Sequence, residues 1–227
     1  MTGVDASAAV PELSDDDLAT LDAQIDHALA TGDQSALEVL GYGEISAVVA
    51  WKDRLACKRL PPFVDAVQLA AYRGCLFDYL ATLAERGVPV VPTALKSRPR
   101  ADGGLAAYCV QPRLPASRLR PQRLAAASPD QAAALFGGLV DIVLSCVTPP
   151  IGLDAQLANW VHDGAGFGYL DVTTPLLRDA GGHDRLDADL FLASLPWLLR
   201  GVVKKLLLRG ILDKYYQPRG VVLDALG

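Results

Sequence analysis

The spacing of hydrophobic residues predicts a helix over residues 14–31. Ser14 is a residue type that caps helix N-termini, and acidic residues follow it in the first turn. Apolar residues recur at intervals of three to four on one face: Leu18, Leu21, Ile25 and Leu29. The run Thr31-Gly32-Asp33 ends the helix. Because only one face is apolar, we expect this helix to pack on the domain that follows.

A pattern typical of strands begins at residue 38. Two runs rich in Val, Ile, Leu and Ala, "EVLGYGEISAVVAW" and "RLACKRL", are joined by a short turn at Lys52-Asp53, which predicts a β-hairpin within 38–60. Helical periodicity follows from about 65 to 86 and stops at Gly87. Beyond it, "VPVVPTALKS" is expected to be extended and "GLAAYCVQPRLP" to form a further strand. The predicted order is β-β-α-β-β, a small sheet with one long helix.

The remainder of the chain is predicted to be mostly helical. Ser128-Pro129 is an N-cap followed by proline at the first helical position, and Pro149-Pro150 ends the helix that it opens. The apolar run over 190–217 is again helical, with a kink at Pro196. Within it, "WLLRGVVKKLLLRGI" mixes apolar and basic residues. We interpret it as a core helix, although such a segment also suits an anionic membrane surface.

A stretch rich in proline and arginine, "PRLPASRLRP", marks a boundary between two lobes. We therefore expect three parts: an N-terminal helical extension (1–37), an N-lobe with the sheet and the long helix (38–114), and a helical C-lobe (115–227).

Composition narrows the functional classes. Of 227 residues, 51% are hydrophobic and 21% charged, which is enough for a large core. The net charge of −5 argues against a dedicated nucleic-acid binder, since no broad basic field would gather phosphates. We expect no membrane span and no signal peptide. Four widely spaced cysteines without a CxxC pair are interpreted as buried thiols, which suits the cytoplasm.

Two features near the start of the sheet could contact a phosphate. Gly41 and Gly43 in "GYGEIS" would let backbone N–H groups approach an anion closely, although a tight hairpin also needs glycine for its own backbone angles. Lys58 in "LACKRL" lies on the strand that follows, from which a basic side chain can reach that turn. A solvated lysine on a sheet edge is the alternative.

A second group of polar residues lies in "IGLDAQLANWVHDGAGFGYLDVTTP", at 151–175. Asp154 and Asn159 are five residues apart, and Asp171 follows a short apolar run that ends in "FGYL". Mg²⁺ favours a few carboxylate or amide oxygens together with phosphate oxygens and water, and these three residues offer such oxygens. Alternatively, Asp154 caps a helical turn and Asp171 begins a turn toward "TTP".

In this order, the glycine turn, strand lysine, long helix, further strand, helix, D-x4-N motif and final aspartate resemble the protein-kinase-like superfamily. The likeness is to its small-molecule branch, the aminoglycoside phosphotransferase and choline kinase relatives. "ERGVPVVPT" at 85–93 is also similar to the segment that follows the regulatory helix there. The resemblance covers roughly 38–175. It implies an α+β, two-lobed protein-kinase-like fold, with a small antiparallel sheet plus helix as N-lobe and a shortened, mostly helical C-lobe.

The resemblance also implies roles in the N-lobe. Gly41 and Gly43 would match the glycine-rich loop, and Lys58 the lysine that contacts the α- and β-phosphates of ATP. Asp78 on the long helix would be the acidic partner of that lysine. The segment from Tyr108 to Gln111 would lie beside the adenine.

In the C-lobe, the resemblance makes Asp154 the catalytic-loop aspartate, and Asn159 and Asp171 the Mg²⁺ ligands. Ser46 stands where the third glycine of the glycine-rich loop is usual. Gly152 stands where the family's catalytic loop has histidine, and "DVT" replaces Asp-Phe-Gly.

Three functions therefore stay open. The first is a Mg-ATP-dependent phosphotransferase acting on a small hydroxylated or aminated molecule. The second is a pseudokinase-like module that binds nucleotide, or a partner, without transfer. The third is an interaction protein in which the motif order is a coincidence. The sequence specifies neither the acceptor nor the oligomeric state.

Overall fold

The computed structural model describes residues 10–42, 47–115, 127–162, 166–187, 190 and 212–226. Their contacts form two compact units. The sheet unit contains the described residues from 10 to 73 and from 92 to 113. The loop unit contains residues 74–91 and the described residues from 114 onwards.

The first helix, α1 (Asp15–Thr31), confirms the predicted helix and its caps. The Ser14 side chain accepts a hydrogen bond from the Asp17 N–H, and Gly32 ends the helix with a left-handed φ of 78°. The apolar face packs on the sheet as expected, with one exception: Leu29 is 75% exposed, and Ala28 is buried instead. Periodicity gives the face of a helix but not the length over which a partner covers it.

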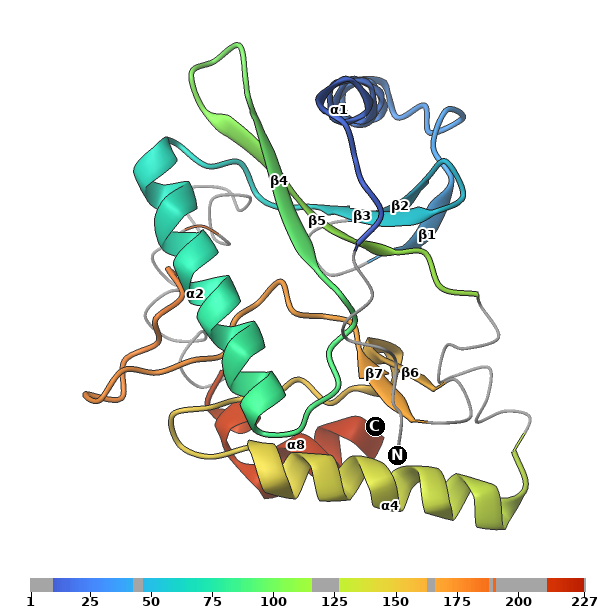
Figure 1. Cartoon of the computed structure of the whole chain (residues 1–227), viewed down its shortest axis with the longest axis vertical. Helices are drawn as coiled ribbons and strands as arrows, with labels where there is room; N and C mark the ends of the chain where they lie inside the picture. Colours follow the sequence, from blue (N-terminus) through green and yellow to red (C-terminus); the bar gives the residue numbers. More distant parts are fainter. Residues whose placement is uncertain are drawn as a thin grey trace. The chain divides into compact units, whose positions relative to one another are not determined.

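The sheet is antiparallel with the order β1-β2-β3-β5-β4 (Figure 1). Its strands are β1 (Val39–Tyr42), β2 (Ala47–Trp51), β3 (Leu55–Arg59), β4 (Ala94–Pro99) and β5 (Leu105–Pro112). The first predicted run therefore contains two strands, so three strands rather than two precede the long helix. The turn between β2 and β3 lies at Lys52 and Asp53, as predicted, and both have positive φ, 47° and 54°.

The two faces of this sheet differ. Residues of β3 and β5 pack with α1 in one hydrophobic cluster on the first face: Leu55, Cys57, Ala106, Tyr108 and Val110. Because side chains alternate along a strand, Lys58 lies on the second face. Lys58 pairs in register with Cys109, and Val48 pairs with both Lys58 and Gly41.

The long helix, α2 (Ala66–Glu85), ends before Gly87, whose φ is 77°, as predicted. Its first turns belong to the sheet unit and the rest, from Gly74, to the loop unit. The buried residues recur at helical spacing: Tyr72, Cys75, Leu76, Tyr79 and Leu83.

The loop unit contains α4 (Pro129–Cys146), η2 (Leu157–Asn159), β6 (Trp160–His162), β7 (Phe167–Tyr169), η3 (Lys214–Tyr216) and α8 (Pro218–Leu226). Ser128 and Gln131 form a capping box at the start of α4, which confirms the predicted N-terminus. Helix α8 was not predicted from the sequence. Most of the helix expected over 190–217, with Pro196 and the segment 197–211, lies outside the described residues.

An α+β fold with a five-stranded antiparallel sheet, one long helix and a following part that contains α4 and α8 is thus confirmed. This element order agrees with the one expected from the sequence, apart from the additional strand β1. Within the described ranges, every helix is too short or too polar to cross a bilayer.

Candidate functional site

The loop that carries Asp154 is held at its start by backbone hydrogen bonds. After the Pro149-Pro150 turn, the Gly152 N–H donates to the Leu176 carbonyl at 2.9 Å, and the Leu153 N–H donates to the Tyr215 carbonyl at 3.0 Å. The buried Tyr79 hydroxyl on α2 donates to the Gly152 carbonyl at 3.0 Å. Three separate segments therefore fix the backbone that precedes Asp154.

Close packing explains glycine at position 152. A Cβ there would lie 2.9 Å from the Leu176 Cβ, 3.2 Å from the Tyr215 carbonyl oxygen and 3.2 Å from Tyr216 Cδ1. Histidine, the usual residue of the kinase-like pattern, has no room here. Two of the three residues that fill this space, Tyr215 and Tyr216, belong to the C-terminal segment (212–226), which supports the loop.

Asp154 is half-buried. Its Oδ1 accepts a hydrogen bond from the Gln156 N–H at 3.2 Å, and its carbonyl oxygen accepts one from the Asn159 side-chain amide at 3.3 Å. Burial raises the pKa of the Asp154 carboxyl, and the charges of Asp171 and Asp224 act in the same direction. The hydrogen bonds from Gln156 and Asn159 oppose this rise in pKa.

A small hairpin brings Asn159 and Asp171 together across the twelve positions that separate them. Strands β6 and β7 pair with Trp160 opposite Tyr169, and the Leu170 N–H donates to the Asn159 carbonyl at 2.8 Å. The two predicted metal ligands therefore flank one hairpin, Asn159 immediately before β6 and Asp171 two residues after β7. Asp171 Oδ1 accepts hydrogen bonds from the hydroxyl of Thr173, at 2.8 Å, and from its N–H, at 3.3 Å.

Asn159 and Asp171 offer oxygen ligands that suit a Mg²⁺ ion bound mainly through the phosphates of a nucleotide. The Asn159 amide nitrogen donates to Asp154, an orientation that leaves its Oδ1 as an acceptor for a cation. Asp171 supplies a carboxylate. Within the described ranges no three His, Cys, Asp or Glu side chains form a metal cluster. A Mg²⁺ ion that keeps water and phosphate ligands needs only one or two protein carboxylates.

Four polar residues near this loop were missed: Gln156, Thr173, Lys214 and Asp224. Thr173 follows Asp171 by two positions, and Gln156 follows Asp154 by two, a spacing typical of aspartate-initiated turns and readable in the sequence. Asp224 on α8 accepts from Gln156 Nε2 at 3.5 Å and from Lys214 Nζ at 2.8 Å. No sequence motif indicates Lys214 or Asp224.

In the sheet unit, the predicted nucleotide residues divide between the two faces. Gly41, Lys58 and Gln111 fall on the second face, away from α1, by the strand register. Gln111 Nε2 donates to Thr93 Oγ1 at 2.9 Å. Tyr108 belongs to the first face, where its hydroxyl donates to the buried Asp22. Its side chain therefore does not share a face with Lys58.

Two further predicted positions complete the set. Gly43 lies outside the described residues. Asp78 is exposed on α2 and forms an ion pair with Arg185 at 2.6 Å. The nucleotide roles of Gly41, Gly43, Lys58, Asp78, Tyr108 and Gln111 stay predictions.

A protein-family model described as "Family of unknown function (DUF6206)" matches residues 20–227. The chain belongs to this family. Among solved structures, the DUF6206 chain is similar to "WaaP in complex with acyl carrier protein", with 17% identity over 85% of each chain and a TM-score of 0.41. A comparison with curated proteins gave no match.

Proposed function

We propose that the chain is a kinase-like, Mg-ATP-dependent phosphotransferase acting on a small molecule. The observation that supports this most is the local geometry around Asp154. Its carbonyl accepts from the Asn159 amide, and the β6–β7 hairpin puts Asp171 beside Asn159. One loop and one hairpin thus offer a carboxylate for an acceptor hydroxyl and two oxygens for the metal.

Each residue of this set has a distinct proposed role. Asp154 orients the acceptor hydroxyl and receives its proton, a task suited to a half-buried carboxylate whose pKa is raised. Asn159 and Asp171 hold Mg²⁺, which neutralises charge on the phosphates. In the sheet unit, Lys58 and the backbone at Gly41 contact the phosphates of ATP, while Gln111 contributes to adenine binding.

Ligand-dependent stability tests this proposal. Mg·ATP at about 100 times its Kd should stabilise the chain by about 2.7 kcal/mol, and the gain should vanish when Mg²⁺ is chelated. Asp171→Asn removes a metal ligand and should abolish the shift in melting temperature. Lys58→Met should weaken nucleotide binding. Asp141→Asn, an exposed carboxylate on α4, is the matched control and should keep the full shift.

Turnover separates this function from the pseudokinase-like alternative. ATP consumption, measured over a panel of small alcohols and amines, should depend on Asp154 and be lost in Asp154→Asn. Binding of Mg·ATP without any turnover that depends on Asp154 would favour a nucleotide-binding module. If millimolar Mg·ATP gave no shift at all, both functions would be refuted and an interaction protein would remain.

A further inference from the structure

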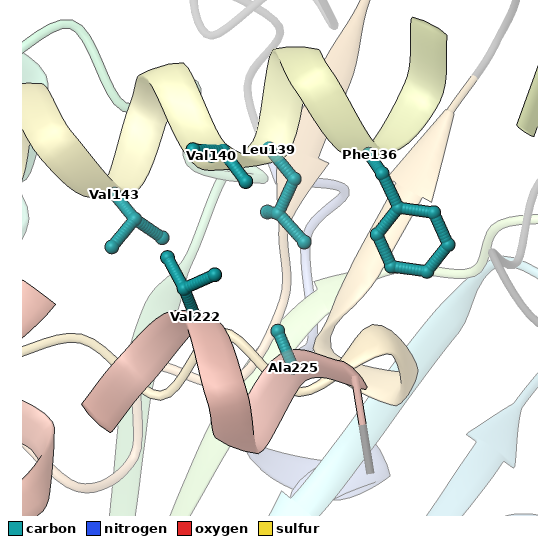
Figure 2. Close-up of a pocket in the computed structure, with 6 residues that line it drawn as sticks. All are labelled: Phe136, Leu139, Val140, Val143, Val222 and Ala225. Carbon is teal, nitrogen blue, oxygen red and sulfur yellow. The ribbon is translucent and has the colours of Figure 1, made fainter. Parts of the chain in front are cut away.

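The C-terminal helix α8 is anchored on the loop unit by an apolar contact with α4. Figure 2 shows Phe136, Leu139, Val140 and Val143 of α4 facing Val222 and Ala225 of α8 around a small apolar crevice. Val221 and Ala225 are buried. This packing fixes the direction of α8 and leaves its polar residue Asp224 half-buried, next to the Asp154 loop.

Two contacts join the C-terminal segment to that loop. The first is the backbone hydrogen bond from the Leu153 N–H to the Tyr215 carbonyl, one residue before Asp154. The second is from Gln156 Nε2 to Asp224 Oδ2, two residues after Asp154. The segment therefore contacts the loop on both sides of the proposed catalytic aspartate.

Lys214 completes the arrangement. Its ammonium group lies 2.8 Å and 3.0 Å from the two carboxylate oxygens of Asp224, and 4.7 Å from the centre of the Tyr215 ring. A lysine in contact with both oxygens and with the neighbouring ring holds η3 against α8. The two contacts with the loop are thereby coupled to each other.

We propose that Asp224, held by Lys214, is a positioning residue for Asp154. The C-terminal segment holds the loop in place, a role that a side chain at position 152 cannot take. Gly152 has no space for a side chain because Leu176, Tyr215 and Tyr216 surround it. The inference rests on the proposed function for its catalytic consequence, whereas the brace itself can be measured without any activity.

Hydrogen exchange in the full-length chain tests the brace directly. Asp224→Asn neutralises the carboxylate to which Lys214 and Gln156 donate, and Lys214→Met removes its ion-pair partner. Each should speed amide exchange in a peptide covering residues 152–158 by about tenfold, the scale of one hydrogen bond to a charged group. Lys214→Arg keeps the charge and should restore slow exchange. Arg219→Gln, an exposed charge on the same helix, should leave the exchange unchanged.

The same variants test the catalytic consequence. Asp224→Asn should lower kcat about tenfold while the Kd for Mg·ATP stays within about twofold, because the metal ligands are not in the brace. In combination with Gln156→Ala, the effects should be less than additive. Unchanged exchange in Asp224→Asn, or faster exchange over the whole chain, would overturn the positioning role. If the wild-type chain failed to bind Mg·ATP, only the proposed function would fall, and the exchange would still decide about the brace.

Discussion

Asp22 on α1 is a buried carboxylate with three partners from the sheet, and removing it should destabilise the sheet unit strongly. It is 1% exposed, accepts from Arg98 Nη1 at 2.7 Å and from the Tyr108 hydroxyl, and lies 3.4 Å from Arg59 Nη2. Burial acts to raise the pKa of Asp22, but the hydrogen bonds from Tyr108 and Arg98 and the charge of Arg59 outweigh it and lower the pKa.

The size of the effect follows from these contacts. A hydrogen bond to a charged group contributes about 1.5–3 kcal/mol, and breaking a buried pair by removing one partner costs about 3–5 kcal/mol. Arg98 is 37% exposed, so water compensates part of the interaction that it loses when Asp22 is removed. Arg59 is only 13% exposed, so its lost interaction is compensated less. We therefore expect Asp22→Ala to cost about 3 kcal/mol. In a chain of this length the melting temperature should fall by roughly 6–12 °C.

Urea unfolding followed by tryptophan fluorescence, to which Trp51 at the α1 cluster contributes, measures this cost. Asp26→Ala is the control. Asp26 lies one helical turn further along α1, pairs with Arg59 at 2.7 Å and is 49% exposed, so its loss should cost about 1 kcal/mol or less. A cost below about 1 kcal/mol for Asp22→Ala, or equal costs for both variants, would refute the reasoning.

Further predictions concern pH, packing, thiols and capping. Because the folded-state pKa of Asp22 is lowered, its stabilisation is full above the unfolded pKa of about 3.9 and is lost as pH falls through the folded value; urea titrations below pH 5 should show a shallower loss of stability in Asp22→Ala than in the wild type. Gly152→Ala should cost about 1–3 kcal/mol of unfolding free energy from overpacking, and an unchanged urea midpoint would contradict the close packing. Burial raises the pKa of Cys57 to about 12 and that of Cys146 to about 11, so an aromatic disulfide reagent at pH 8 should label both only after unfolding. Ser128→Ala removes the N-cap of α4 and should cost about 1 kcal/mol, measured by thermal unfolding.

Local signals in the sequence were enough for most of the fold. The caps of α1 and α4, the turn at Lys52-Asp53 and the glycine after α2 all act within a few residues, and all were found at their predicted places. The division of the first strand-like run into β1 and β2 was not predicted, because a run of apolar residues does not show where a chain reverses. Helix α8 is only nine residues long, and its position depends on α4, a partner far away in the sequence.

The candidate site was predictable to a similar degree. Asp154, Asn159 and Asp171 were selected because the order of motifs along the chain resembles that of kinase-like proteins, and their roles stay predictions. The β6–β7 hairpin, which was not predicted, brings Asn159 and Asp171 together. The alternation along β3 and β5 puts Tyr108 on the face opposite to Lys58, although both had been assigned to the nucleotide. Asp22 was missed because a charged residue in an amphipathic helix is expected to be solvated, and only its tertiary partners reveal its burial. Asp224 was missed because its helix, α8, was not predicted.

The crowding around Gly152 also has a consequence for how related chains can vary. Position 152 contacts Leu176, Tyr215 and Tyr216, so a larger residue at 152 requires smaller or displaced residues at the other positions. In an alignment of the family, these four columns should therefore covary, and a histidine at 152 should occur only in members whose C-terminal segment is shorter or takes another course. A single substitution cannot introduce a histidine at position 152 in this chain, because the loop and the C-terminal segment have to change together.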